Sequence, residues 1–174
     1  VDPEIMDIKS YRFNKWIRFW DTPGLGDGIY QDKIHSKKIK KLLNITYAKK
    51  KYGCIDMVVV IIEGSKKEMG TTFKILNELL KPNISANRII IAVNQADEAM
   101  GGYHWDEKNV IPDEKLKIFL DEQATSIKNR IKDSTGISIK KPVYYSALNN
   151  YNIYALLDFI IDNIPKSRRY MYRK

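Results

Sequence analysis

Three short apolar runs and the helical patterns around them dominate the hydrophobic pattern of the chain. Residues 57–62 and 89–93 are nearly unbroken aliphatic runs, and residues 143–145 are a shorter third run. Strands of this kind are typical of a parallel sheet buried on both faces by helices. Apolar positions at helical spacing predict helices over residues 71–81, 113–133 and 152–163. The alternation of strand and helix predicts a three-layer α/β fold with a mostly parallel sheet.

The N-terminal part of the chain has a different pattern. Apolar and polar residues alternate over 5–11 and 16–20, with a turn signal at Asn14 and Lys15, so we expect an antiparallel hairpin at a sheet edge. A glycine-rich loop follows. A basic amphipathic helix is then expected over 33–50. Its apolar stripe consists of Ile34, Ile39, Leu42, Leu43 and Ile45.

Composition describes one globular domain with an uneven charge. The chain has 174 residues and a formal net charge of +9. Residues 33–51 carry eight Lys and no acid, and residues 166–174 form a basic tail with five Lys or Arg. Such clusters indicate a polyanionic partner, either RNA or the ribosome or an anionic membrane surface. A solvated lysine-rich face explains them equally well.

Other features exclude several classes of protein. No apolar run approaches the roughly 18 residues that span a bilayer, so we do not expect an integral membrane protein. The single Cys54 excludes an internal disulfide and suits a cytoplasmic location. His35 and His104 have no Cys or carboxylate at zinc-ligand spacing. Neither a sequence-specific DNA reader nor an aromatic stack for nucleic acid is indicated, and the oligomeric state stays open.

Polar motifs follow the predicted strands, where ligands of α/β sheets bind. Asp21 and Gly24 form an Asp-x-x-Gly sequence after the second strand, and a carboxylate there can hold Mg²⁺ through a water while the glycine N–H approaches a terminal phosphate. Asp97 ends an Asn-x-x-Asp sequence and can accept hydrogen bonds from guanine N1–H and the 2-amino group. Ala147 offers an N–H for guanine O6. Each motif alone also fits a simple strand-ending turn, whereas the ordered trio indicates a nucleotide site.

The trio resembles the third, fourth and fifth guanine-nucleotide motifs of translation-factor-related P-loop GTPases. The stretch from Trp20 to Gly28 is similar to the Era-like branch and, within it, to the YfjP-type bacterial GTPases. Further similarity lies at residues 70–72, 94–97, 104–105 and 144–147, so the resemblance covers the chain from Pro3 to about Pro165.

The resemblance implies a GTP-binding domain that hydrolyses GTP to GDP slowly, with Mg²⁺, as a molecular switch. It makes Asp21 the water-mediated Mg²⁺ ligand and Gly24 the γ-phosphate sensor. It makes Asn94 the organiser of the base loop, Asp97 the guanine reader and Ala147 the O6 donor. Thr22 joins the catalytic group, and Gln95 and Ser146 join the base-binding group.

Three departures from the family qualify this expectation. Gln95 replaces the usual Lys of the base motif, and Leu25 stands where many GTPases place a water-orienting Gln, so hydrolysis should be slow or assisted. The third departure is the absence of a Gly-x-x-x-x-Gly-Lys-Ser/Thr loop ahead of Asp21. The stretch 64–72 imitates it with the wrong spacing and is better explained as a loop with a helix cap at Thr71 or Thr72.

We therefore expect an N-terminally incomplete G domain that lacks its first strand, phosphate loop and first helix. The strands ending at Asp21 and spanning 55–62 would then stand about 9–10 Å apart or be rearranged, and the fragment alone would be inactive. Two alternatives stay open. One is a nucleotide-binding regulatory module without turnover, and the other is an RNA- or ribosome-binding protein on a GTPase scaffold.

Overall fold

The computed structural model describes residues 8–26, 28–49, 51–65 and 69–171. By their contacts, the residues divide into two compact units. Unit 1 comprises Val1–Ile55 and Arg168–Lys174, and unit 2 comprises Asp56–Ser167. The described residues include no helix that is both long and apolar enough to cross a membrane.

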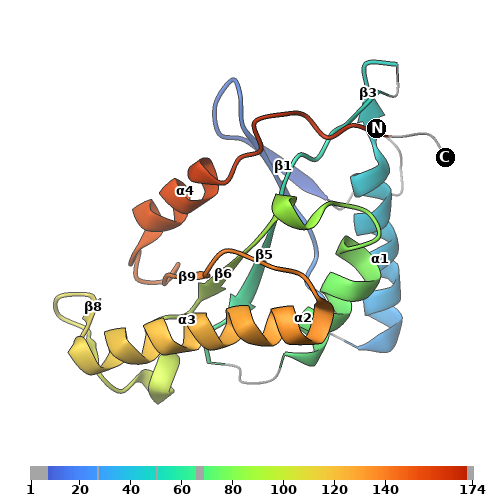
Figure 1. Ribbon diagram of the computed structural model, residues 1–174. Coiled ribbons are helices and arrows are strands. Elements are labelled where there is room, and N and C mark those ends of the chain that lie inside the picture. The colour runs from blue at the N-terminus through green and yellow to red at the C-terminus, as the bar shows by residue number, and fades with distance from the viewer. Residues whose placement is uncertain (1–7, 27, 50, 66–68, 172–174) are drawn as a thin grey trace. The chain divides into compact units, whose positions relative to one another are not determined.

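Unit 2 contains the parallel sheet that the aliphatic runs predict. Strand β5 (Val58–Glu63) pairs with β6 (Ile89–Asn94), and β6 pairs with β9 (Val143–Tyr144) (Figure 1). Both pairings are parallel, with Glu63 opposite Asn94 and Val93 opposite Tyr144. The carboxyl ends of the three strands therefore lie side by side at one edge of the sheet.

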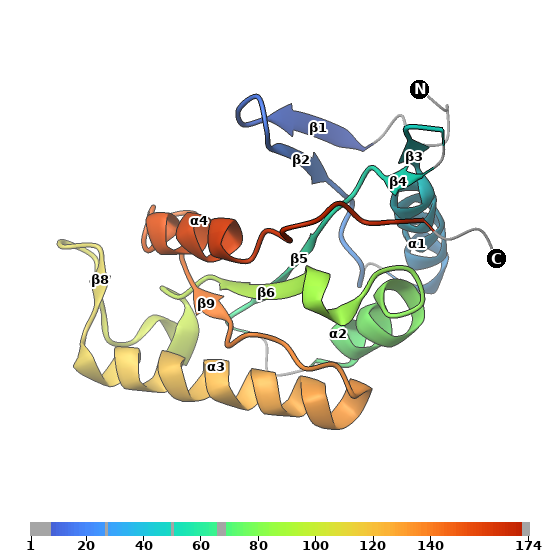
Figure 2. The ribbon, with the colours of Figure 1, turned by 45° about the horizontal axis from the view of Figure 1, so that its top comes forward.

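Helices cover this sheet on both faces. Helix α3 (Glu114–Thr135) lies along one face, together with α2 (Gly70–Lys74) and its π-helical continuation Ile75–Leu80, whereas α4 (Ile153–Asp162) lies on the other (Figure 2). Helix α3 begins at Asp113, whose side chain accepts a hydrogen bond from Leu116 N, and ends at Gly136 with a left-handed φ of 71°. The three predicted helices are thus confirmed with bounds shifted by a few residues. The predicted cap at Thr71 or Thr72 is wrong, because both lie inside α2 and Met69 precedes it without a side-chain cap.

The two long strands differ in burial. Strand β6 is buried along nearly its whole length, as predicted, with Ile91 and Ala92 fully inaccessible. Strand β5 is not, since no residue of it is fully buried and Ile61 is 59% exposed. The expectation that 57–62 is buried on both faces is therefore wrong. The physical reason is that β5 pairs only with β6 among the described strands, so that one of its edges lacks a neighbour.

Smaller elements complete unit 2. A short hairpin, β7 (Trp105–Asp106) with β8 (Ile111–Pro112), leads into α3. Two 3₁₀ segments, Ala86–Arg88 and Ala99–Gly102, flank β6. Buried Arg88 donates to the carbonyl oxygens of Asp56 at 3.0 Å and Ser167 at 2.9 Å, and so ties the two ends of the unit together.

Unit 1 begins with the predicted antiparallel hairpin. Strand β1 (Lys9–Arg12) pairs with β2 (Arg18–Asp21) in an antiparallel register that places Tyr11 opposite Phe19. Residues 5–7 of the predicted first strand lie outside the described residues. Strands β2 and β5 belong to different units. The expected spacing of about 9–10 Å between them therefore stays a prediction.

The basic helix is confirmed with corrected limits. Helix α1 (Ile29–Asn44) begins earlier than expected and ends six residues earlier than position 50. The chain instead forms a hairpin of β3 (Thr46–Tyr47) and β4 (Tyr52–Gly53). The turn between them uses Ala48 and Lys49 with φ of 51° and 56°, which no helix accommodates. Of the predicted stripe, Leu42 and Leu43 are buried.

The basic tail is partly structural. Arg169 is 5% exposed and its guanidinium donates to the carbonyl oxygen of Leu43, while its own carbonyl oxygen accepts from Gly53 N at 2.8 Å. Tyr170 packs on Tyr52, with ring centroids 4.8 Å apart. This part of the tail therefore belongs to the packing of unit 1, and residues 172–174 lie outside the described residues.

Candidate functional site

The structure brings the predicted base-binding residues together at the carboxyl ends of β6 and β9. Asn94 is the last residue of β6, and its side-chain Oδ1 accepts a hydrogen bond from Ala147 N at 3.0 Å. The backbone reinforces this link, because Tyr145 N donates to Val93 O at 2.9 Å and Ala96 N to Tyr145 O at 3.1 Å. Asn94 thus joins the two loops. The predicted O6 donor, Ala147 N, is engaged by Asn94 in this conformation.

Asp97 has an asymmetric environment. Its Oδ2 accepts a hydrogen bond from Asn149 Nδ2 at 3.0 Å. Its Oδ1 is buried, and no donor among the described residues reaches it. A buried acceptor without a partner costs on the order of 1–3 kcal/mol, so structural packing alone does not explain this carboxylate. A ligand with two adjacent N–H groups would satisfy both oxygens once the 147–150 loop or the carboxylate shifts to admit it.

The loop after β9 is held in a closed turn. Ser146 is fully buried, and its N–H and carbonyl oxygen pair with those of Tyr151, both at 3.0 Å. Its Oγ accepts from Asn149 N at 3.1 Å. Asn152 Nδ2 donates to Tyr144 O at 2.7 Å and closes the turn from the far side. These contacts fix Asn149 where it meets Asp97, while Ala147 and Leu148 stay exposed at the tip.

The end of β5 supports the same site through a glycine. Gly64 N donates to Asn94 O at 2.7 Å, and a Cβ on Gly64 would stand 2.8 Å from that oxygen and 3.1 Å from Gln95 O. Only glycine permits this approach of two backbones. Gln95 itself has a φ of 64°, and its Oε1 accepts from Ser65 Oγ at 3.3 Å. Gln95 therefore faces the β5 loop.

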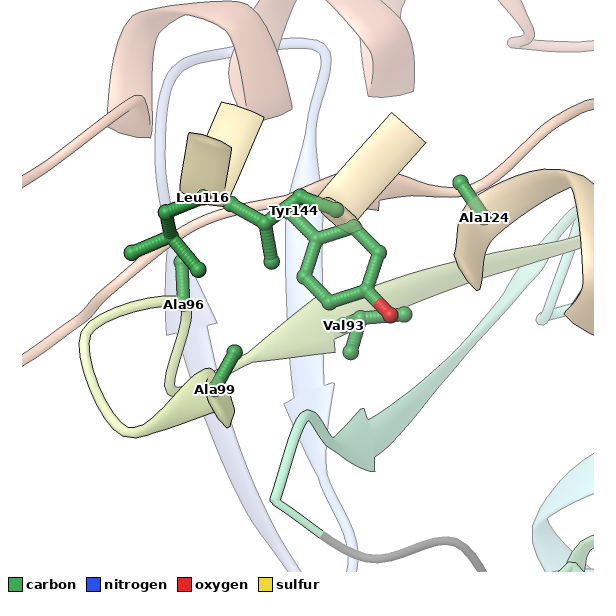
Figure 3. Packing of buried hydrophobic residues seen from close by; sticks show 7 residues of the cluster. Val93, Ala96, Ala99, Leu116, Ala124 and Tyr144 are labelled. Atoms are coloured by element: carbon green, nitrogen blue, oxygen red, sulfur yellow. The ribbon is translucent and has the colours of Figure 1, made fainter. Parts of the chain in front are cut away.

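A hydrophobic cluster carries the base loops. Its buried members are Val93, Ala96, Ala99, Leu116, Leu120, Ala124 and Tyr144. Figure 3 shows the Tyr144 ring over Val93, with Ala96, Ala99 and Leu116 gathered at the end of the strand. Burying each large aliphatic side chain stabilises the fold by roughly 1.5–3 kcal/mol. The loops that contain Asn94 and Asp97 are therefore anchored to a packed hydrophobic cluster.

His104 and Trp105 serve packing and capping. His104 Nδ1 lies 2.7 Å from Asp113 Oδ2, and Trp105 meets Tyr151 edge to face with ring centroids 5.3 Å apart. The backbone hydrogen bond from Leu116, and then the contact with His104, lower the pKa of Asp113. Trp105 thus packs against the 146–151 turn and supports it.

A cavity of about 220 Å³ lies beside the end of β5. Its polar lining includes Glu63, Gln123, Ser126 and Arg130. The Tyr144 hydroxyl, which also lines it, donates to Gln123 Oε1 at 2.9 Å, and burial raises the pKa of Tyr144, so it stays a neutral donor. None of the residues predicted to bind the base lines this cavity.

The predicted phosphate and Mg²⁺ residues belong to unit 1. Asp21 and Thr22 are exposed at the end of β2. The loop after them is tied to α1, since His35 Nδ1 lies 2.8 Å from Gly24 O and Gly26 N donates to Asp32 Oδ1 at 2.8 Å. Sequence reasoning missed Asp32 and considered His35 only as a zinc ligand. A Cβ on Gly24 would meet nothing within 4 Å, so Gly24 has no packing reason to be glycine.

The donor chemistry at Asp21 fits a hard cation. Its exposed carboxylate supplies oxygen, the ligand that Mg²⁺ takes directly or through water. Among the described residues, no three His, Cys, Asp or Glu side chains lie together as a metal site.

Comparisons with known proteins give one structural likeness. No protein-family model matches the chain, and no curated protein does. Among solved structures, it is similar to a variant of Era from Aquifex aeolicus bound to GDP and AlF₄⁻, with a TM-score of 0.49 and 16% sequence identity. The match covers 95% of this chain and 46% of that Era chain, so the chain spans less than half of its neighbour's length.

Proposed function

We propose that this protein binds guanine nucleotides and that unit 2 holds the base. The observation that carries the proposal is the carboxylate of Asp97, which keeps Oδ1 buried and unpartnered while Asn149 holds Oδ2. Guanine presents N1–H and the 2-amino group side by side, whereas adenine presents an acceptor at N1 and no 2-amino group. A carboxylate at this position therefore favours guanine.

The loop Asp21–Gly24 supports the proposal that the nucleotide is GTP with Mg²⁺. Bound Mg²⁺ would neutralise charge on the phosphates, and Asp21 would hold it through water. The Gly24 N–H would meet the terminal phosphate. His35 and Asp32 connect this loop to α1. Loss of the terminal phosphate would therefore change the position of the helix as well as that of the loop, as in a molecular switch.

Hydrolysis is proposed to be slow. Leu25 carries no group that can orient a water, and a phosphate-cradling Gly-x-x-x-x-Gly-Lys loop does not occur in the 174 residues. We therefore expect the 174-residue chain to hydrolyse GTP slowly or not at all. Single-turnover hydrolysis by this chain separates a slow GTPase from a regulatory module that binds without turnover.

A second candidate function is RNA or ribosome binding through the Lys-rich segment 33–51. The observation that favours it is the exposure of Lys33, Lys37 and Lys40 along α1. Replacing Lys37 and Lys40 with Gln should flatten the salt dependence of RNA binding. Binding that is absent at low salt would leave a solvated helix face as the explanation.

Titration of the ¹⁵N-labelled 174-residue chain with nucleotides at millimolar concentration tests the base site directly. GDP should shift the amide resonances of Asp97, Ala147 and Asn149, whereas ADP should not. Equal shifts with GDP and ADP, or shifts confined to other residues, would overturn the proposal.

A further inference from the structure

The tip of the β1–β2 hairpin exposes aromatic side chains on an ordered turn. Trp16 is 80% exposed and Phe13 is 55% exposed. The turn is fixed by Asn14, whose Oδ1 accepts from Trp16 N at 2.7 Å and Ile17 N at 2.8 Å, and by Phe13 N, which donates to Ile17 O at 3.0 Å. The hairpin thus holds two large apolar rings in solvent. Exposing apolar surface to water is unfavourable, and the fold of the hairpin does not require aromatic residues at these two positions.

Positive charge surrounds the same tip. Arg12 and Arg18 are directly opposite each other in the β1–β2 register, and both are exposed. Like charges opposite each other on two strands are destabilising. Residues 9–20 contain four cations (Lys9, Arg12, Lys15 and Arg18) and no Asp or Glu. Anionic groups at the tip would relieve this repulsion.

The side-chain arrangement favours a lipid surface. Lys15 Nζ lies 5.0 Å from the Trp16 ring centroid, and Phe13 meets Phe19 edge to face with centroids 6.0 Å apart. Each ring is thus engaged on one side by a neighbouring side chain. Trp and Phe beside Lys and Arg are the composition that settles at the headgroup level of a membrane.

We propose that this hairpin tip docks on an anionic lipid bilayer. Phe13 and Trp16 enter the interfacial region, and Arg12, Lys15 and Arg18 meet lipid phosphates. The proposal concerns unit 1 and is independent of nucleotide binding, so its failure would leave the proposed base site untouched.

Vesicle sedimentation of the 174-residue chain tests it. The two vesicle types are phosphatidylcholine alone and phosphatidylcholine with about 30% phosphatidylserine, whose negative surface attracts basic segments. We expect binding to the anionic vesicles only. The double substitution Phe13→Ser and Trp16→Ser should weaken it about tenfold or more, and Arg12→Gln with Arg18→Gln should weaken it by about fivefold per charge.

Matched variants and a nucleic-acid arm complete the design. Tyr154→Ser removes an aromatic ring that is 84% exposed in unit 2, and Lys108→Gln with Lys115→Gln removes two exposed charges there. These variants should bind as the parent does. Circular dichroism confirms that each variant is folded. The proposal is overturned if anionic vesicles do not bind, if the hairpin and control variants weaken binding equally, or if the hairpin variants abolish binding to poly-uridine RNA but not to vesicles.

Discussion

Asn149 Nδ2 donates to Asp97 Oδ2 at 3.0 Å and thereby joins the loop after β9 to the loop after β6. The two residues are 52 positions apart in the chain. The bond orients one carboxylate oxygen and leaves Oδ1 buried without a donor. The proposed base site rests on this geometry, and the base-site predictions below follow from it.

Asn149→Ala should weaken GDP binding about five- to tenfold, because the hydrogen bond that positions Asp97 is lost. The measurement is the dependence of the amide shifts on GDP concentration. Asn163→Ala is the matched control. Asn163 Nδ2 also donates one hydrogen bond, to the backbone carbonyl oxygen of Phe159 at 2.7 Å, but Asn163 lies at the end of α4. Equal losses in both variants would show that Asn149 has only a structural effect.

Gly64→Ala should destabilise the chain by about 1–3 kcal/mol, because the new Cβ meets two backbone oxygens that cannot move independently. Gly24→Ala is the control, and it should change the free energy of unfolding by less than about 0.5 kcal/mol because its Cβ site is open. Urea unfolding measures both. A Gly64→Ala variant as stable as the parent would mean that the ends of β5 and β6 are not held together as described.

Asp97→Ala should leave the free energy of unfolding within about 1 kcal/mol of the parent. The substitution loses one hydrogen bond but also removes the unpartnered buried Oδ1. A large loss of stability in urea unfolding would instead identify Asp97 as a structural residue.

Asp113→Ala should lower the melting temperature by about 2–4 °C at neutral pH, as expected for a lost helix N-cap. The folded pKa of Asp113 is lowered, first by the backbone hydrogen bond from Leu116. A lowered carboxyl pKa stabilises the fold above the unfolded pKa, and this contribution is lost as pH falls through the folded pKa. The difference between parent and variant should therefore narrow below about pH 4. A difference that is constant from pH 7 to pH 3 would contradict this role.

The sequence pattern predicted β6 and the helices of unit 2 well. A strand buried on both faces leaves an unbroken apolar run, and a helix buried on one face leaves apolar residues at helical spacing. It could not distinguish β5 from β6, since both runs are aliphatic and only the sheet order shows that β5 has one described neighbour. The end of α1 could not be predicted because the turn after it lacks a sequence signal. Ala48 and Lys49 adopt positive φ without the Gly or Asn that usually marks such a turn.

The motif residues of the candidate site could be named from the sequence, whereas the residues that hold them in place could not. Asn94, Asp97 and Ala147 follow strand ends, which a sequence shows. Asn149 and Gly64 act through partners distant in the chain, and neither carries a local signature. Gly64 lies in the stretch 64–72, which the sequence predicts to be a loop, although a glycine directly after a strand also indicates a close approach of two backbones.

Base choice by Asp97→Asn tests the central claim most directly. In this variant the side chain offers a donor as well as an acceptor, which suits the carbonyl at position 2 of xanthine better than the 2-amino group of guanine. Amide-shift titrations of the parent and the variant with GDP and xanthosine diphosphate should show a reversal of preference, with the parent favouring GDP and the variant favouring xanthosine diphosphate. An unchanged response to GDP in the Asp97→Asn variant would contradict the assignment of this site to guanine.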